Sequence, residues 1–240
     1  MNNFELPCLE DRAGAPFPDT TEALDSPNGL LAWGGDLQPN RVLRAYRSGI
    51  FPWYSEGQPL LWWSPAPRCV IFPEKVHISR RTRRRYNSGK FSLSLDSAFA
   101  EVIAACAAPR GEDNGTWITR EMLEAYIQLH RLGHAHSLEV WEEGELVGGI
   151  YGLAMGSIFF GESMFSHKTD ASKIALITLC RQLHQWGVEL LDCQVGNPHL
   201  FSMGAEQISR TTFERLLREL TSQTGTEQNW RGPVSFEPRW

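Results

Sequence analysis

The sequence predicts a mixed α+β fold, and three observations indicate that class. Amphipathic helical patterns come first, strands joined by short turns follow, and the chain then continues as helix, strand and helix. The turn signals Glu143-Gly144 and Gly156-Ser157 divide the strand region into three antiparallel strands of a meander. A strongly apolar helix follows the meander, so we expect it to pack across a mixed sheet.

The composition of the chain changes near residue 69. Residues 1–68 are rich in Pro and Gly and contain one readable helix, with Pro39 in its first turn and Gly49 just past its end. Residues 69–240 hold the longer periodic runs. We therefore predict a small N-terminal α/β domain over 1–68 and a larger C-terminal domain over 69–240, whose last ~15 residues form a loosely ordered tail.

Caps and periodicity predict the remaining elements. Ser79 is placed to cap a short helix, and Asp170 to cap the long apolar helix that ends at Gly187. Thr211 and Glu214 have the spacing of a capping box for the last helix. The other predicted elements are a strand at 69–72, helices at 96–107 and 119–133, meander strands at 137–142, 145–153 and 158–161, and a buried strand at 188–194.

The composition disfavours several classes of protein and site. The chain contains no apolar run of about 18 residues, so we expect no transmembrane helix. Residues 1–6 are polar and lack the apolar core of a signal peptide. The five cysteines are scattered without a C-x-x-C pair, which favours a reducing cytoplasm over disulfides or a zinc site. His134 and His136 are two apart, and neither an H-E-x-x-H pair nor a phosphate-binding glycine motif exists. We therefore expect no metal site and no dinucleotide site.

Positive charge is concentrated in one segment of a chain whose formal net charge is -5. Five arginines fall within six residues: Arg80, Arg81, Arg83, Arg84 and Arg85. The segment 68–90 holds eight Lys or Arg and one acid, so it carries +7 while the rest of the chain carries -12. A polyanion such as nucleic acid would be attracted to this segment and repelled elsewhere. A solvated helix face is the alternative interpretation.

Two carboxylates lie inside apolar runs, Glu162 in Phe-Phe-Gly-Glu-Ser-Met-Phe and Asp192 in Leu-Leu-Asp-Cys-Gln. A carboxylate is rarely buried without a partner, because its desolvation is costly. Asp192 and Gln194 are two residues apart, so they face the same way from one strand. Two interpretations stay open: a structural ion pair in the core, or the polar floor of a pocket walled by Phe159, Met164 and Phe165.

A series of distinctive words runs through the chain: GLLAWGGDL (29–37), AYRSGIFPWY (45–54), PLLWWSPAPR (59–68), TWI (116–118), GHAHSLEVW (133–141), LVGGIYG (146–152), FFGESMFS (159–166), ASK (171–173), DCQ (192–194) and SMGA (202–205). In these words, and in their order from about residue 16 to 220, the chain resembles the leucyl/phenylalanyl-tRNA–protein transferase family. The departures are minor, with Ile150 where members can have Met and Met203 where Leu is usual.

The resemblance implies an aminoacyltransferase. Members of this family move Leu or Phe, and less readily Met, from aminoacyl-tRNA to proteins that begin with Arg or Lys. The product carries an N-terminus that marks it for degradation in the bacterial N-end rule pathway. The family has a small N-terminal domain and a larger domain that resembles the N-acetyltransferase (GNAT) fold.

The same resemblance implies the setting and the partners of the enzyme. The ester bond of an aminoacyl-tRNA is already activated, so no metal or cofactor is required. The implied partners are Leu-tRNA, Phe-tRNA and the acceptor proteins, in the cytoplasm and without a membrane. We expect the chain to act as a monomer.

The resemblance also implies roles for three polar residues. The family residue that matches Gln194 is assigned to the attacking amine, and the one that matches Asp192 supports it. We interpret Gln194 as orienting the amine through a hydrogen bond and Asp192 as stabilising the transient ammonium. Glu162 matches a glutamate near the acceptor site, where a carboxylate suits the cationic side chain of N-terminal Arg or Lys, and Asp192 could share that task.

Substrate-binding residues follow from the resemblance in the same way. Trp53 and Trp117 match aromatic residues near the terminal adenosine, with packing in the core as the alternative. The five arginines are expected to grip the acceptor arm of the tRNA and to take no part in the chemistry. No role follows for His136. The flexible apolar pocket for the Leu or Phe side chain is expected to consist of Ile150, Phe159, Met164 and Leu191.

Two rival functions are weighed against this one. An acetyltransferase that uses coenzyme A needs a glycine-containing pyrophosphate loop before the central helix, and residues 166–173 contain no glycine. A non-catalytic RNA-binding module would bind tRNA without transfer. It gives no reason for Glu162 to accompany Asp192 and Gln194.

Overall fold

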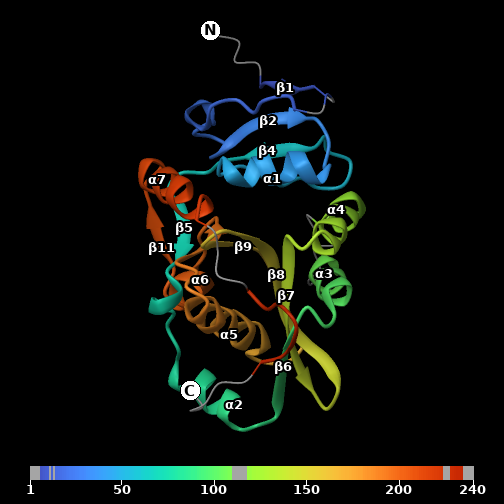
Figure 1. Cartoon of the computed structure of the whole chain (residues 1–240), viewed down its shortest axis with the longest axis vertical. Coiled ribbons are helices and arrows are strands. Elements are labelled where there is room, and N and C mark those ends of the chain that lie inside the picture. Colours follow the sequence, from blue (N-terminus) through green and yellow to red (C-terminus); the bar gives the residue numbers. More distant parts are fainter. Residues whose placement is uncertain (1–5, 11, 13, 110–117, 224–227, 235–240) are drawn as a thin grey trace.

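The chain folds around two β-sheets. The computed structural model describes residues 6–10, 12, 14–109, 118–223 and 228–234. A four-stranded sheet and α1 (Pro39–Arg47) lie at one end of the molecule, and α2 (Arg80–Asn87) lies at the opposite end (Figure 1). This arrangement confirms the mixed α+β class. Within the described ranges, no helix combines the length and the apolar character needed to cross a membrane.

The small sheet has the order β1-β2-β4-β3. Trp62, which belongs to one of its strands, is fully buried and donates its indole N–H to Gly34 O at 2.9 Å. Helix α1 begins at Pro39 and is followed by Gly49 at φ 75°, as predicted. The strands are β1 (Cys8–Leu9), β2 (Leu30–Gly34), β3 (Phe51–Pro52) and β4 (Leu61–Trp63), with a short 3₁₀ helix at Thr20–Glu22.

The large sheet has eight strands in the order β11-β5-β10-β9-β8-β7-β6-β12. Strands β7, β8 and β9 form the predicted antiparallel meander. Strand β10 runs parallel to β9 and antiparallel to β5. The bounds are β5 (Arg68–Ile71), β6 (Phe91–Leu95), β7 (Ala135–Glu142), β8 (Glu145–Met155), β9 (Ile158–Ser166), β10 (Leu190–Gln194), β11 (Glu206–Ile208) and β12 (Gly232–Pro233).

Helices cover both faces of the large sheet. Tyr151 and Ile150 are neighbours on β8 but belong to different apolar clusters, because alternate residues of a strand face opposite sides. Helices α3 (Phe99–Ala107) and α4 (Arg120–Arg131) share the Tyr151 cluster, and α5 (Ala171–Gln185) lies in the other. Helices α6 (Pro198–Ser202) and α7 (Arg210–Thr221) follow β10, and a short 3₁₀ helix occupies Pro73–Lys75.

One apolar cluster joins the two sheets. It contains Trp62 and Tyr46 from the N-terminal part together with Phe160 and Phe213 from the rest of the chain. The change from one sheet to the other falls between β4 and β5, close to residue 68. The division into two domains at that point stays a prediction.

Several predicted helix starts were wrong, for physical reasons. Helix α3 begins at Phe99, because Asp96 adopts φ 49° and accepts the Ser137 N–H at 2.8 Å. The cap of α7 is Ser209, which accepts from Thr212 N, while Glu214 accepts a hydrogen bond from Thr20.

The ends of two further elements also depart from the predictions. Asp170 precedes α5 as expected, but its carboxylate faces basic side chains and makes no capping hydrogen bond. The predicted loose tail was wrong for residues 228–234. There Trp230 is buried and stacks on His136 with ring centroids 4.2 Å apart, and β12 pairs with β6.

Candidate active site

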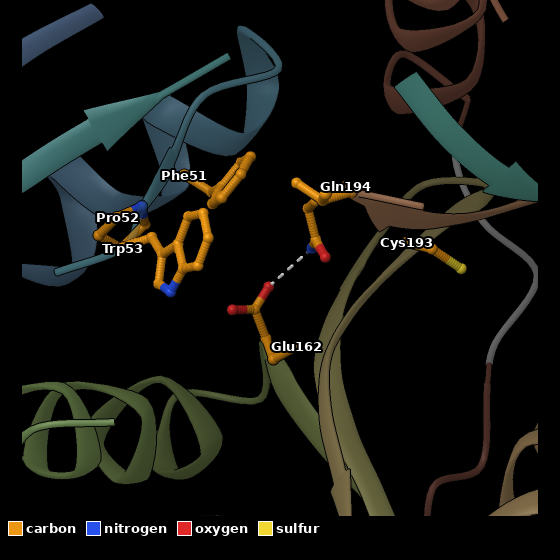
Figure 2. A pocket seen from close by; sticks show the side chains of 7 residues that line it. Phe51, Pro52, Trp53, Glu162, Cys193 and Gln194 are labelled. Carbon is orange, nitrogen blue, oxygen red and sulfur yellow. Dashed lines mark hydrogen bonds between the residues drawn. The ribbon is translucent and has the colours of Figure 1, made fainter. Parts of the chain in front are cut away.

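Two hollows meet at the carboxyl end of β10. The first, of about 130 Å³, is lined by Phe51, Pro52, Trp53, Glu162, Cys193, Gln194 and Val195. The second, of about 240 Å³, is lined by Ile150, Gly161, Glu162, Ser163, Met164, Leu176, Leu191, Cys193, Gln194, Val195, Asn197 and Leu200. Glu162 and Gln194 line both hollows, and their side chains point toward one another (Figure 2).

Gln194 owes its orientation to an irregularity in the sheet. The register between β10 and β5 shifts between Asp192 and Gln194, and Gln194 adopts φ 56°. A left-handed conformation is uncommon for a residue other than glycine and needs support from its surroundings. That support includes Asp192, whose Oδ1 accepts the backbone N–H of Gln194 at 3.0 Å. The Gln194 side chain then reaches Glu162 across the site, with Nε2 donating to Oε1 at 3.3 Å.

Asp192 does not reach either hollow. Its side chain is fully buried, and Arg68 donates from Nε to Oδ1 at 2.9 Å and from Nη2 to Oδ2 at 2.7 Å. The core ion pair left open by the sequence is therefore present. The role of Asp192 toward the ammonium stays a prediction, and its burial offers that role no direct contact with either hollow.

Glu162 is held by two buried tyrosines. Tyr46 on α1 donates to Oε1 at 2.7 Å, and Tyr126 on α4 donates to Oε2 at 3.0 Å. Burial raises the pKa of Glu162 to about 7, and these two hydrogen bonds limit the rise. Burial also raises the pKa of both tyrosines well above its ordinary value, so both stay protonated donors.

The sequence gives no direct sign of this tyrosine pair. Tyr46 lies in the helix predicted to start at Pro39, and Tyr126 lies in the helix predicted over 119–133. The available signal was a hydroxyl group on each buried face, since a buried tyrosine usually has a hydrogen-bond partner. Which partner it was depended on the packing of α1 and α4 around β9.

Three of the four side chains expected in the apolar pocket line the second hollow: Ile150, Met164 and Leu191. Phe159 does not. It is fully buried beside Trp230, with ring centroids 5.5 Å apart. Phe165 is also buried outside this lining. Leu176 of α5 and Leu200 of α6 contribute to the wall instead, and neither was predicted.

Trp53 lines the first hollow and keeps 40% of its surface exposed, which leaves its ring available for stacking. Its ring centroid lies 5.4 Å from that of Trp63. Trp117, the other aromatic residue expected near the adenosine, lies outside the described residues.

The predicted arginine helix forms, with Ser79 accepting the Thr82 N–H as its cap. The Nε atoms of Arg81 and Arg85 lie 3.6 and 3.5 Å, respectively, from Oδ2 of Asp170, which precedes α5. This ion pairing offsets part of the repulsion among the arginines. Arg80, Arg83 and Arg84 are exposed on the same helix. All five lie on α2, at the end of the molecule opposite the small sheet (Figure 1).

Asp96, His130 and His136 form a separate cluster whose donor atoms could hold a metal ion. Their groups already bind one another and the backbone. His136 Nδ1 lies 2.8 Å from Asp96 Oδ2, and His130 Nδ1 donates to Ala135 O at 2.8 Å. The His136 ring also stacks on Trp230, and the His130 ring stacks on Phe99. These contacts stabilise the start of β7. His136, for which the sequence suggested no role, therefore has structural contacts with Asp96 and Trp230.

Solved structures with a similar arrangement share little sequence with this chain. A GCN5-related N-acetyltransferase from Kribbella flavida is 9% identical, with 74% of this chain and 66% of that chain covered and a TM-score of 0.40. L-PGS from Bacillus licheniformis is 12% identical, with 85% and 66% covered and a TM-score of 0.39. TM-scores this low carry no argument, so the likeness to the N-acetyltransferase fold stays an expectation.

Comparison with protein families and curated relatives is decisive. The family model described as leucyl/phenylalanyl-tRNA protein transferase matches residues 70–218, and the model of its N-terminal domain matches residues 35–66. The leucyl/phenylalanyl-tRNA–protein transferase of Hahella chejuensis is 57% identical over 94% of this chain and 95% of that protein. That of Stutzerimonas stutzeri is 58% identical over 84% and 89%. The chain therefore belongs to the leucyl/phenylalanyl-tRNA–protein transferase family, and it is an aminoacyltransferase.

Proposed function

We propose that this enzyme transfers Leu or Phe, and less readily Met, from aminoacyl-tRNA to the α-amino group of proteins that begin with Arg or Lys. One observation carries the proposal: an apolar hollow and an aromatic hollow share Glu162 and Gln194. An aminoacyl ester has the matching parts, namely an apolar side chain, an adenosine and a reactive carbonyl between them. The hydrogen-bonding pair at the junction would then face the reacting carbon.

The second hollow is assigned to the side chain of the transferred amino acid. Ile150, Leu191 and Leu176 supply its apolar wall, and Met164 supplies a flexible one. An unbranched thioether adapts its shape, which supports binding of both Leu and Phe. Trp53 in the first hollow is assigned to stacking on the terminal adenosine.

The reaction joins an amine to an ester carbonyl. The neutral α-amine attacks the carbonyl carbon, the ester C–O bond breaks, and the ribose hydroxyl leaves with a proton. Gln194 donates to Glu162 through Nε2, and its Oε1 is an acceptor that can take a hydrogen bond from the amine. We assign to Glu162 the stabilisation of the transient ammonium that was expected of Asp192, because its carboxylate lines both hollows. The same carboxylate can also receive the amine proton.

The acceptor is proposed to be a protein with a cationic N-terminal residue. The carboxylate of Glu162 at the junction supports this choice, because it attracts the positive charge of Arg or Lys. The product would begin with Leu or Phe and enter the N-end rule degradation pathway. A cytoplasmic setting, where charged tRNA is available, completes this proposal.

A transfer assay tests the substrates directly. The enzyme is mixed with Phe-tRNA and a peptide that begins with Arg, and the added Phe is followed by mass spectrometry. We expect one Phe on the Arg peptide, far less on the same peptide beginning with Ala, and none on an N-acetylated Arg peptide. Equal labelling of the Arg and Ala peptides would contradict the proposed acceptor class. Binding of tRNA without any transfer would favour the RNA-binding module.

The arginines of α2 are proposed to hold the acceptor arm of the tRNA. We expect R80A/R84A to weaken tRNA binding and to lower the slope of log K against log salt by about 2, because each phosphate contact contributes about one counterion. The rate at saturating tRNA should stay close to that of wild type.

R81A/R85A is the matched control for this double variant. It removes the same charge, but from side chains that face Asp170. We expect a smaller change in the salt slope. A large loss of saturated rate in R80A/R84A would mean that these arginines do more than hold the tRNA. Binding titrations at several salt concentrations, with single-turnover rates, measure both quantities.

A further inference from the structure

We propose that Arg68 is a positioning residue for aminoacyl transfer, which acts through Asp192 to fix Gln194 and which also holds the wall that carries Trp53. This inference deepens the function proposed above and rests on it. Arg68 touches neither hollow and is 1% exposed, so it cannot contact the substrate itself. Its charge also lowers the pKa of Glu162, and R68K keeps that charge while it changes the geometry.

All three groups of the Arg68 guanidinium that carry N–H donors are engaged. Nε and Nη2 bind the two oxygens of Asp192, at 2.9 and 2.7 Å. Nη1 donates to Gly49 O at 3.0 Å. The plane lies against two aromatic rings, with Cζ 5.0 Å from the centroid of Phe51 and 4.5 Å from that of Phe213. A planar fork held in this way has one orientation.

The first path runs from Arg68 to Gln194. Asp192 Oδ1 accepts from Arg68 Nε and also from the backbone N–H of Gln194. Gln194 adopts φ 56° directly after the register shift, so its backbone needs an external acceptor to hold it there. If the carboxylate of Asp192 turned, the Gln194 side chain would lose its direction toward Glu162 (Figure 2).

The second path runs from Arg68 to the opposite wall of the first hollow. Gly49 O is held by the guanidinium, and the chain continues from there through Phe51 and Pro52 to Trp53. Phe51 both lines the hollow and packs on the guanidinium. One buried side chain therefore sets the separation between the Trp53 wall and Gln194.

Stability alone is a poor reason for this arrangement. A buried ion pair is often no better for stability than well-packed apolar residues of similar size, because both charges lose their hydration. Compared with apolar packing, the ion pair also fixes the orientation of the Asp192 carboxylate. A lysine could keep the charge but could not bind both oxygens of Asp192 and Gly49 O in one plane.

The test is a double-mutant cycle between Arg68 and Gln194, measured in the transfer assay with Phe-tRNA and the Arg peptide. We expect R68K to lower kcat by about a hundredfold, as misplacement of reacting groups by about 1 Å can do. The Kd for Phe-tRNA should stay within about twofold of wild type. We expect R68K/Q194A to be no slower than Q194A, because residues that act as a unit are non-additive.

The outcomes separate this inference from the function on which it rests. If wild type fails to transfer Phe, the proposed function fails before Arg68 is tested. If wild type transfers and the losses of R68K and Q194A multiply in full, or if R68K matches wild type, only the role of Arg68 is overturned. R41K is the matched control, since Arg41 is also buried and paired with an acid, Asp36, outside both hollows. It should leave kcat unchanged.

R68M/D192L covers the case in which R68K does not fold. Apolar replacement of both partners of a buried pair commonly preserves folding. We expect this variant to fold and to transfer at least about tenfold more slowly than wild type, because Gln194 has lost its acceptor. A folded R68M/D192L with the kcat of wild type would overturn the proposal. Failure of both variants to fold would overturn it too, since the pair would then be a requirement of the fold.

Discussion

Glu162→Gln is expected to slow transfer by about a hundredfold or more, which is the usual contribution of a positioned acid or base. Glutamine keeps the size of the side chain and can still accept a hydrogen bond from Tyr46. It cannot accept a proton from the attacking amine or carry the negative charge that the acceptor's N-terminus would meet. Single-turnover rates with preformed Phe-tRNA and the Arg peptide measure the loss.

The pH dependence gives this prediction a second readout. The pKa of Glu162 is raised to about 7, so the carboxylate that receives the proton forms as the pH rises through 7. Wild-type transfer should therefore rise with pH and show an inflection near pH 7. A second inflection should come from the α-amine of the peptide, whose pKa is typically about 7.7–8.0. E162Q should keep the inflection of the amine and lose the other. An unchanged profile in E162Q would contradict the role of Glu162.

The stability of the folded protein should also depend on the titration of Glu162. In the unfolded chain Glu162 loses its proton near its ordinary pKa of 4.5, whereas in the folded chain it keeps it up to about 7. Between these values the folded state binds more protons, so wild type loses stability as the pH rises. E162Q lacks this loss, and its melting temperature relative to wild type should increase from pH 5 to pH 8. Glu121→Gln is the matched control, since Glu121 also accepts from a tyrosine, Tyr54 at 3.0 Å, but lies outside both hollows.

Gly152→Ala is expected to lower the free energy of unfolding by about 3 kcal/mol, the upper part of the usual range for overpacking. A Cβ at this position would lie 2.0 Å from Phe160 O and 2.5 Å from Phe159 Cε1. The carbonyl belongs to the backbone of β9, so it can move only if the strand moves. Since β9 carries Glu162, transfer should fall as well. Urea unfolding at equilibrium measures the change.

Gly161→Ala provides the comparison, because Gly161 is paired with Gly152 across the two strands. The nearest atom to a Cβ there is Leu191 Cδ2 at 3.5 Å, which is an ordinary contact. We expect its stability to stay within about 1 kcal/mol of wild type. Equal losses in the two variants would show that the sheet tolerates the Gly152 side chain by shifting.

Local signals in the sequence predicted those parts of the fold that depend on neighbours in the chain. Ser79 and Thr119 cap helices because a short hydroxyl side chain reaches a backbone N–H three residues on. The turns at Gly144 and Gly156 produced the meander for a similar reason. The start of α3 was missed because Asp96 binds Ser137, far along the chain. The capping box predicted for α7 did not form because Glu214 binds Thr20 instead.

The C-terminal residues are ordered by contacts that the local sequence does not reveal. Residues 228–234 have little local pattern, so a loose tail was the reasonable prediction. Trp230 is nevertheless buried, because His136, Phe159 and Trp186 form an aromatic surface that only the folded sheet and α5 bring together.

The sequence by itself determined the class of the fold and the family, and three of the four side chains that it predicted for the apolar pocket line the second hollow. The fold class follows from periodicity, and the family and the pocket residues follow from motifs of consecutive residues. Only the tertiary structure decided which carboxylate lines the two hollows. Asp192 meets Arg68 across 124 positions of sequence, and Glu162 meets Tyr46 across 116. The two acids look alike in their apolar runs. One is neutralised in the core and the other is held at the junction of two hollows, because partners distant in the chain set the environment of each.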